Sequence, residues 1–504
     1  MTQSWSNFFF GALDPGGWIT VDTPPAALWF QAAFAKLFGF SSWSLLLPSA
    51  IAGAGAVWLL TVTVRRVWGR TAGFVAGIAM ALTPVVLAVS RSNNPDGVLM
   101  FSVVAAAWAT ERSISTRKAR WMYVAGGLCG FAFLTKLLAA GLVMPGMWLA
   151  YLLAARHPWR WRAGHLLLAA ASFVGVAGVW VGAVQLTPAS SRPYIGGSTD
   201  GTALDLIVGY NGLGRVTGNG NGPGGGGAGG GARPGGFGGA AGSGSGFTVD
   251  QFGGTPGIDR LFNNGMGDQV MWLAPVAGAA ALAGVADAVR RRRLDSKVGS
   301  VVLFAGRAAV AYVVFAFAEG IYHNYYVSLL APAVAALVGV GAAMARRAGR
   351  VGRVIVVAVL VATALLQLAL LRRIPAYTWL RVVVPAGLAL AALAWIGLAV
   401  GRGAGRKTML GTVIATGGVA LLAPAVWAWN GTQSPRAAPS PTPARPWSDP
   451  PWAARVAGRC RAGRPVRAGR PVAFRARVPS AAASTRGCSP GCARSVRRRR
   501  GWWP

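Results

Sequence analysis

Apolar runs long enough to cross a lipid bilayer recur through most of this 504-residue chain, and they constrain its fold more than any other feature. A spanning helix needs about 20 mostly apolar residues, and in lipid only helices and closed barrels satisfy their own backbone. The sequence therefore predicts an all-α polytopic membrane protein. About twelve spanning helices are expected, at residues 43–64, 72–90, 96–111, 121–138, 140–155, 164–186, 270–289, 298–318, 324–345, 354–371, 379–401 and 408–429.

Basic residues gather in six short loops, one after every second predicted helix. They are Arg65, Arg66 and Arg70; Arg112, Arg117, Lys118 and Arg120; Arg156, Arg160 and Arg162; Arg290–Arg293 and Lys297; Arg346, Arg347, Arg350 and Arg353; and Arg402, Arg406 and Lys407. The positive-inside rule places these loops in the cytoplasm and the 187–269 loop outside the cell. A net charge of +36 would otherwise suggest nucleic acid, but its distribution argues against a nucleic-acid partner.

The same pattern predicts how the chain is organised. The expected segments are an external loop with an interfacial helix (1–42), two halves of a membrane bundle (43–186 and 270–429), an external loop (187–269) and a tail (430–504). Twelve helices put both ends outside, and residues 1–17 lack the features of a signal peptide, so we expect that a first helix is missing. The tail holds sixteen arginines after residue 434, which is typical of a shifted reading frame in a GC-rich gene.

Ionisable residues outside the basic loops gather at the opposite, outer ends of the predicted helices. They are Asp14, Asp22, Arg91, Asp96, Lys136, Arg192, Arg215, Glu319 and His323. Each one alone would most often be an ordinary solvated residue at the interface, but ionisable groups at membrane depth are functional candidates. Their convergence on one face favours a site there.

Several spaced motifs carry a family resemblance. WITVDTPPAALW, SRSNNPD, FLTK, SRPYIGGS, YNGLGR and GIYHNYY together resemble the bacterial membrane glycosyltransferases of the ArnT/protein-mannosyltransferase superfamily, and among them the YkcB-like branch, over residues 3 to 430. The resemblance implies a GT-C helical bundle in the bacterial cell membrane. It also implies that the outer face takes a hexose or pentose from a polyprenyl-phosphate carrier and transfers it to a lipid, glycan or protein acceptor.

The resemblance and the chemistry assign roles to the outer residues. Asp22, or else Asp14, would accept the proton of the acceptor hydroxyl. Asp96 would orient the acceptor or a divalent metal, which the sequence leaves open. Cations would stabilise the leaving phosphate, and relatives usually have a lysine where this chain has Thr23. The predicted substrate-binding residues are Arg91, Asn94, Lys136, Arg192, Tyr194, His323 and Tyr325.

The remaining features of the sequence do not indicate a second functional site. Residues 26–40 are expected to form an amphipathic helix in the interface, and the glycine-rich stretch 219–246 reads as a flexible external tether, because a phosphate-binding loop needs a strand before it and a helix after it. The four cysteines suggest neither a disulfide framework nor a metal site. Two alternatives remain open. A transporter would place its charges near the bilayer midplane, and an inactive remnant of an enzyme would keep the fold alone.

Overall fold

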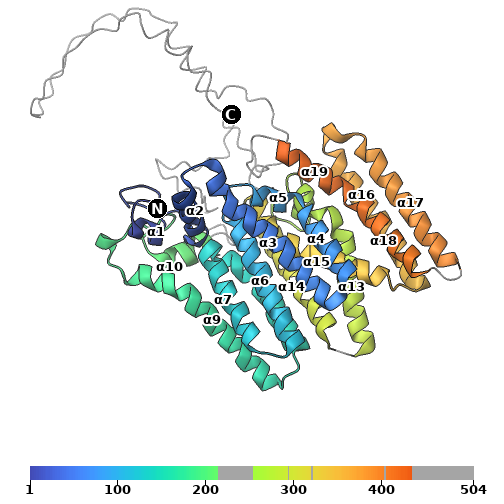
Figure 1. Ribbon diagram of the computed structural model, residues 1–504, viewed down its shortest axis with the longest axis horizontal. Helices are drawn as coiled ribbons and strands as arrows, with labels where there is room; N and C mark the ends of the chain where they lie inside the picture. The colour runs from blue at the N-terminus through green and yellow to red at the C-terminus, as the bar shows by residue number, and fades with distance from the viewer. Residues whose placement is uncertain (214–253, 293, 319–321, 402–404, 434–504) are drawn as a thin grey trace, which may run out of the picture. The chain divides into compact units, whose positions relative to one another are not determined.

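Helices make up nearly all of the regular structure in the computed structural model, which describes residues 1–213, 254–292, 294–318, 322–401 and 405–433 (Figure 1). The first half contains α1 (Trp5–Phe10), α2 (Ala26–Phe38), α3 (Ser42–Trp68), α4 (Arg70–Ala81), α5 (Pro84–Ser90), α6 (Asp96–Thr116), α7 (Arg120–Lys136), η1 (Leu137–Val143), α8 (Met144–Ala154), α9 (Trp159–Leu186), η2 (Ala189–Ser191), α10 (Ala203–Asp205) and η3 (Leu206–Leu213). The second half contains η5 (Arg260–Phe262), α12 (Gly267–Val270), η6 (Met271–Leu273), α13 (Ala274–Arg291), α14 (Ser296–Phe317), η7 (Asn324–Leu329), α15 (Ala331–Ala345), α16 (Arg350–Arg372), η8 (Pro375–Tyr377), α17 (Leu380–Val400), α18 (Arg406–Ala420) and α19 (Leu422–Gln433).

Eight helical segments in the described part of the chain are long and apolar enough to cross a membrane, or ten if each of two bent pairs is one span. The predicted all-α membrane fold is therefore observed, whereas the predicted count of twelve is not confirmed. The segments include Asn324–Ala345, the most deeply buried of them, but not α6, whose Glu111 and Arg112 lower its mean hydropathy.

The two bent pairs correspond to two predicted spans that were expected to be continuous. α4 and α5 meet at 65°, and α18 and α19 meet at 43°. Pro84 is the first residue of α5, and Pro424 lies in the first turn of α19. Proline has no N–H to donate, and it disfavours helical geometry in the residue before it, so both breaks have a local cause.

Residues 120–154 form a helical hairpin rather than one long span. The ring of His165 in α9 lies 6.1 Å from that of Tyr123 at the start of α7, and its Nδ1 atom lies 2.8 Å from the hydroxyl of Tyr151 at the end of α8. The two ends therefore lie together, and the chain reverses at η1, where Leu137 has a φ of 48°. The predicted helices at 121–138 and 140–155 correspond to α7 and to η1 with α8.

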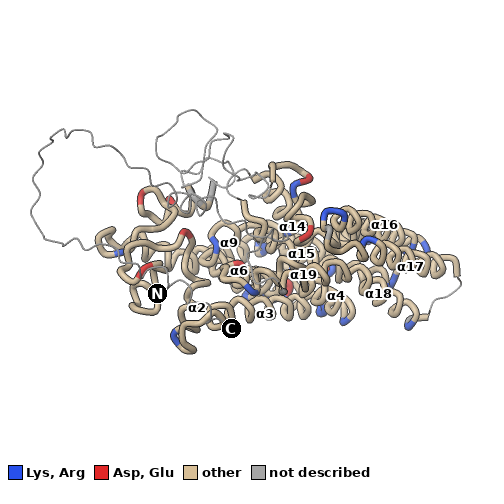
Figure 2. Tube along the Cα trace, turned by 90° about the horizontal axis from the view of Figure 1, so that it is seen from above, with Lys and Arg blue, Asp and Glu red and all other residues tan. Residues whose placement is uncertain are grey.

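The basic loops come together at one end of the bundle, which we call the basic end. Arg66 lies over Trp108, Lys297 lies over Trp68, and Arg346 donates a hydrogen bond to Thr71. These contacts bring together the C-terminal parts of α3, α6 and α15 and the starts of α4 and α14. Figure 2 shows that charged positions are a small part of a trace that is mostly tan. The basic loops that follow every second predicted helix therefore correspond to helix ends on one side of the bundle.

Small residues let the helices approach closely, as is common in membrane bundles. A Cβ atom on Gly146 of α8 would lie 2.6 Å from the backbone nitrogen of Arg307 in α14, and one on Gly339 of α15 would lie 2.4 Å from the carbonyl of Ala72 in α4. Arg307 itself is buried, and its three side-chain nitrogens have no hydrogen-bond partner among the described residues. Neither the sequence nor the structure explains this arginine.

The N-terminal segment is anchored to the bundle at the end opposite the basic loops. The indoles of Trp29 and Trp180 donate hydrogen bonds to the carbonyls of Phe8 and Phe9. The predicted interfacial helix is α2, which buries its alanine side and leaves Phe30 and Phe38 exposed. Figure 1 shows α1 and α2 close to α9 and α10, far from α16 and α17.

Candidate functional site

A cavity of about 700 Å³ opens at this end, which we call the cavity end. Its walls come from the N-terminal segment, the starts of α2, α3 and α6, the end of α7, η1, the end of α14 and η7. Five residues predicted to act in the site line it: Asp22, Asp96, Lys136, His323 and Tyr325. Segments far apart in the sequence therefore bring two carboxylates, an ammonium group and an imidazole to one cavity.

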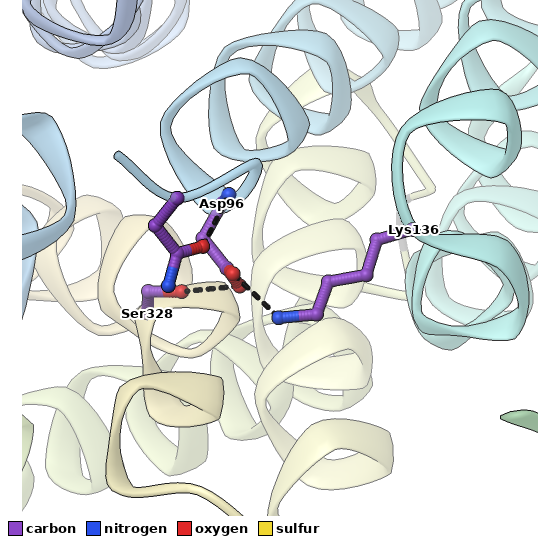
Figure 3. Close-up of polar contacts among 4 residues, drawn as sticks. Asp96, Lys136 and Ser328 are labelled. Atoms are coloured by element: carbon purple, nitrogen blue, oxygen red, sulfur yellow. Dashed lines mark hydrogen bonds and ion pairs between the residues drawn. The ribbon is translucent and has the colours of Figure 1, made fainter. Parts of the chain in front are cut away.

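Asp96 and Lys136 form a buried ion pair on the cavity wall (Figure 3). Their Oδ2 and Nζ atoms are 2.5 Å apart, and the two side chains are 1% and 12% exposed. The Ser328 hydroxyl donates to the other carboxylate oxygen at 3.5 Å, and the Asp96 backbone N–H donates to the side chain of Asn94 at 2.9 Å. Buried charges persist when they are paired and hydrogen-bonded, so this network fixes the Lys136 ammonium at the cavity.

Aromatic rings surround the same ammonium group. Its nitrogen lies 4.6 Å from the ring centroid of Tyr325 and 4.4 Å from that of Tyr326. The imidazole of His323 stacks on Tyr325, with ring centroids 5.1 Å apart and planes 7° apart. Ring faces attract cations within about 6 Å, so η7 both holds Lys136 and offers flat surfaces to the cavity.

Asp22 differs from Asp96 because its side chain is exposed. The Asn211 side chain donates a hydrogen bond to the backbone carbonyl of Asp22 at 2.7 Å, and Thr23 and Pro24 line the cavity next to it. The two prolines that follow Thr23 lie directly before α2, which begins at Ala26 with Pro25 as its N-cap residue. Asp22 is thus an exposed carboxylate at the cavity, held by its backbone.

Three other predicted residues do not line the cavity. The carboxylate of Asp14 accepts hydrogen bonds from the backbone of Trp18 and Ile19 at 3.0 to 3.2 Å. Desolvation raises the pKa of Asp14, but these bonds outweigh it and hold the pKa below its usual value. Arg91 donates to the carbonyl of Thr432 at 3.2 Å, and the Asn94 side chain accepts a hydrogen bond from the backbone N–H of Asp96.

Arg192 and Tyr194 also have local partners instead of facing the cavity. Arg192 donates to the carbonyls of Thr187 and Gly201, and the Tyr194 hydroxyl donates to the carbonyl of Ser198. The backbone of Tyr194 exchanges hydrogen bonds with Trp18 and Thr20 at 2.8 and 2.9 Å. These contacts shape the loop after α9 and join it to the N-terminal segment. Glu319 and Arg215, the other predicted outer charges, lie outside the described residues, as do the glycine-rich stretch and the tail.

Some residues of the site were not singled out from the sequence. Ser328 carries no signal, because a serine near the start of an apolar helix is common. Tyr326 and Asn211 lie within the quoted motifs GIYHNYY and YNGLGR, but nothing in those motifs separates them from their neighbours. In the part of the chain that the structure describes, no group of three or more His, Cys, Asp or Glu residues could hold a metal ion.

Comparison with known proteins supports the resemblance. Residues 22–181 match the model of the dolichyl-phosphate-mannose-protein mannosyltransferase family. The chain is 33% identical to the Bacillus subtilis protein YycA over 68% of its own length and 58% of that protein, and 35% identical to YkcB of the same organism over 68% and 57%. Both are named as mannosyltransferases. A polyprenol-phosphate-mannose–protein mannosyltransferase of Corynebacterium glutamicum is 32% identical over 22% of each chain.

The fold is similar to that of ArnT from Cupriavidus metallidurans, solved with bound undecaprenyl phosphate. The TM-score is 0.50 at 18% identity, and the match covers 81% of this chain and 67% of that one. This match confirms the predicted GT-C-type fold, and the sequence matches confirm the predicted family resemblance. The chain spans less than two thirds of the Bacillus relatives' length.

Proposed function

We propose that this chain, a relative of the GT-C membrane glycosyltransferases, transfers a hexose or pentose from a polyprenyl-phosphate donor to an acceptor at its cavity end. One observation carries the proposal: an exposed carboxylate, Asp22, and a buried ion pair, Asp96–Lys136, line the same cavity. The named activity of the mannosyltransferase relatives and the lipid phosphate bound to ArnT support it.

The proposed reaction needs two kinds of group, and the cavity offers both. An acceptor hydroxyl attacks the anomeric carbon, its proton passes to the Asp22 carboxylate, and the bond from that carbon to the phosphate oxygen breaks with its electron pair left on the phosphate. Lys136 is the one lysine or arginine side chain among the described lining residues, and it would stabilise this charge. Asp96 would keep Lys136 in place, and His323 and Tyr325 would contact the sugar.

A transfer assay tests the proposal. Membranes that contain the full chain are incubated with radiolabelled polyprenyl-phosphate mannose and, separately, with labelled GDP-mannose. We expect label to leave the lipid donor and appear in a lipid, glycan or protein fraction, with no transfer from the nucleotide. Absence of transfer from any polyprenyl-phosphate hexose or pentose would contradict the proposal and favour an inactive remnant.

We also propose that the cavity end faces the outside of the cell and the basic end faces the cytoplasm, because of the positive-inside rule. Ser190, after α9, and Ser115, at the end of α6, are exposed serines at the two ends. With Cys460, Cys488 and Cys492 replaced by serine, Ser190→Cys should react with an impermeant maleimide in intact cells. Ser115→Cys should react only after lysis, and the reverse pattern would invert the orientation.

A further inference from the structure

Three arginines surround two tryptophans at the basic end, outside the site described above. Trp108 of α6 and Trp121 of α7 pack edge to face, with ring centroids 5.2 Å apart. Arg112 lies over both rings, at 5.6 and 4.6 Å from their centroids. Arg66 of α3 lies 5.9 Å from the ring of Trp108, and Arg120 lies 5.7 Å from that of Trp121. We call these five residues the arginine–tryptophan cluster.

The cluster carries positive charge that no carboxylate in the described part of the chain balances. The ion pairs found there are Asp96–Lys136 and Asp287–Arg291, and neither involves the cluster. The Nε atom of Arg112 is buried and has no hydrogen-bond partner among these residues. Glu111 precedes Arg112, but it is buried in the bundle and accepts no hydrogen bond from the cluster. The three arginines of the cluster therefore have no carboxylate as an ion-pair partner among the described residues.

Two of the three guanidinium groups, those of Arg66 and Arg120, belong to exposed side chains that a ligand can reach. A guanidinium group in a cation–π contact still has N–H groups that can donate to a phosphate in the bidentate manner typical of arginine. The two tryptophans are partly exposed. Tryptophan is enriched at the depth of lipid headgroups, so the cluster combines a phosphate-binding group with a membrane-interface position.

We propose that the arginine–tryptophan cluster binds the phosphate headgroup of an anionic phospholipid, in the leaflet at the basic end. Basic pockets between spanning helices are suited to such headgroups. The bound phosphate would bridge α3, α6 and α7 at one end of the bundle. Asp96 and Lys136 lie at the opposite ends of α6 and α7, so the lipid would fix the two helices that carry the ion pair. The proposal does not depend on sugar transfer.

Native mass spectrometry of the full chain in detergent tests the binding. We expect phosphatidylglycerol adducts to survive at lipid concentrations at which phosphatidylcholine adducts are lost. R66Q/R120Q removes two exposed charges of the cluster and should weaken phosphatidylglycerol binding by about 30-fold. R347Q/R350Q is the matched control, because it removes two exposed arginines from the same end outside the cluster, and it should leave the binding unchanged.

Three results would overturn the proposal. Equal retention of phosphatidylcholine would show that headgroup charge is not recognised. Equal loss in R347Q/R350Q would show general attraction to the basic end instead of a site. Displacement of phosphatidylglycerol by an equal concentration of inorganic phosphate would assign the cluster to a free anion. A loss of about 30-fold that is confined to R66Q/R120Q, with phosphate ineffective, supports the lipid site.

Discussion

Asp22→Asn is expected to lower the rate of sugar transfer by about 10²–10⁴-fold, the range in which general base catalysis contributes. Asparagine keeps the size of the side chain and its place in the segment before α2, but it cannot accept the proton of the acceptor hydroxyl. The Asp22 side chain is exposed, so the substitution should change the free energy of unfolding little. The measurement is the initial rate of label transfer from the lipid donor, with the amount of folded protein matched between variants.

Substitutions of two other aspartates serve as controls for this experiment. Asp14→Asn changes the same kind of residue in the same segment. The Asp14 carboxylate accepts hydrogen bonds from the backbone of Trp18 and Ile19 and does not line the cavity. We expect it to keep most of the rate. Asp287→Asn, at the basic end, should keep all of it. Full activity in Asp22→Asn would exclude this carboxylate as the base, and a large loss in Asp14→Asn would assign the role there.

Lys136→Met is expected to destabilise the protein by about 3–5 kcal/mol, the cost of removing one partner of a buried ion pair. The substitution leaves the Asp96 carboxyl group 1% exposed and without its cation, and it also removes the ammonium group from the faces of Tyr325 and Tyr326. The double variant Asp96→Asn/Lys136→Met leaves no uncompensated charge and should recover part of the loss. Transfer activity should fall in both variants, since both lack the cation.

The free energy of unfolding, measured by denaturant titration in detergent for the two single variants and the double variant, gives the coupling energy of the pair. Arg291→Met supplies a matched control, because the Arg291–Asp287 pair is 2.7 Å long but 71% and 50% exposed. Such an exposed pair on a helix contributes about 0.3–0.5 kcal/mol. Additive losses at Asp96 and Lys136 would mean that the pair contributes no stability of its own.

Much of the bundle follows from patterns that act locally. Apolar runs and basic loops locate the helix ends, because lipid demands internal hydrogen bonding and basic residues remain on one side. The bends before Pro84 and near Pro424 also have a local signal, the proline itself. A prediction of spanning helices from hydropathy alone does not take this signal into account. The number of spanning helices is harder to read from the sequence, because α6 carries charged residues and α8, with 11 residues, is shorter than a spanning helix.

The site is harder to predict because a carboxylate in a loop looks the same whatever it contacts. Asp14 and Asp22 both lie near prolines in the N-terminal segment. The Asp14 carboxylate accepts a hydrogen bond from the nearby Trp18 backbone, whereas Asp22 lines the cavity. The pairing of Asp96 with Lys136 depends on how α6 packs against α7, which periodicity does not give. Arg91, Arg192 and Tyr194 have side chains suited to a ligand, but in the structure each donates to a carbonyl oxygen of the chain and none of them lines the cavity.

The contact between the N-terminal segment and the loop after α9 has a consequence for motion. The backbones of Trp18 and Thr20 form hydrogen bonds with the backbone of Tyr194. The Thr20 hydroxyl also accepts a hydrogen bond from the Gly196 N–H, and the Asn211 side chain donates one to the Asp22 carbonyl. Neither segment can shift without breaking bonds to the other, so both belong to one cooperative opening unit. Any widening of the cavity mouth on this side would carry Asp22 outward together with residues 194–211, and the mouth and the exposed carboxylate would open and close on the same timescale.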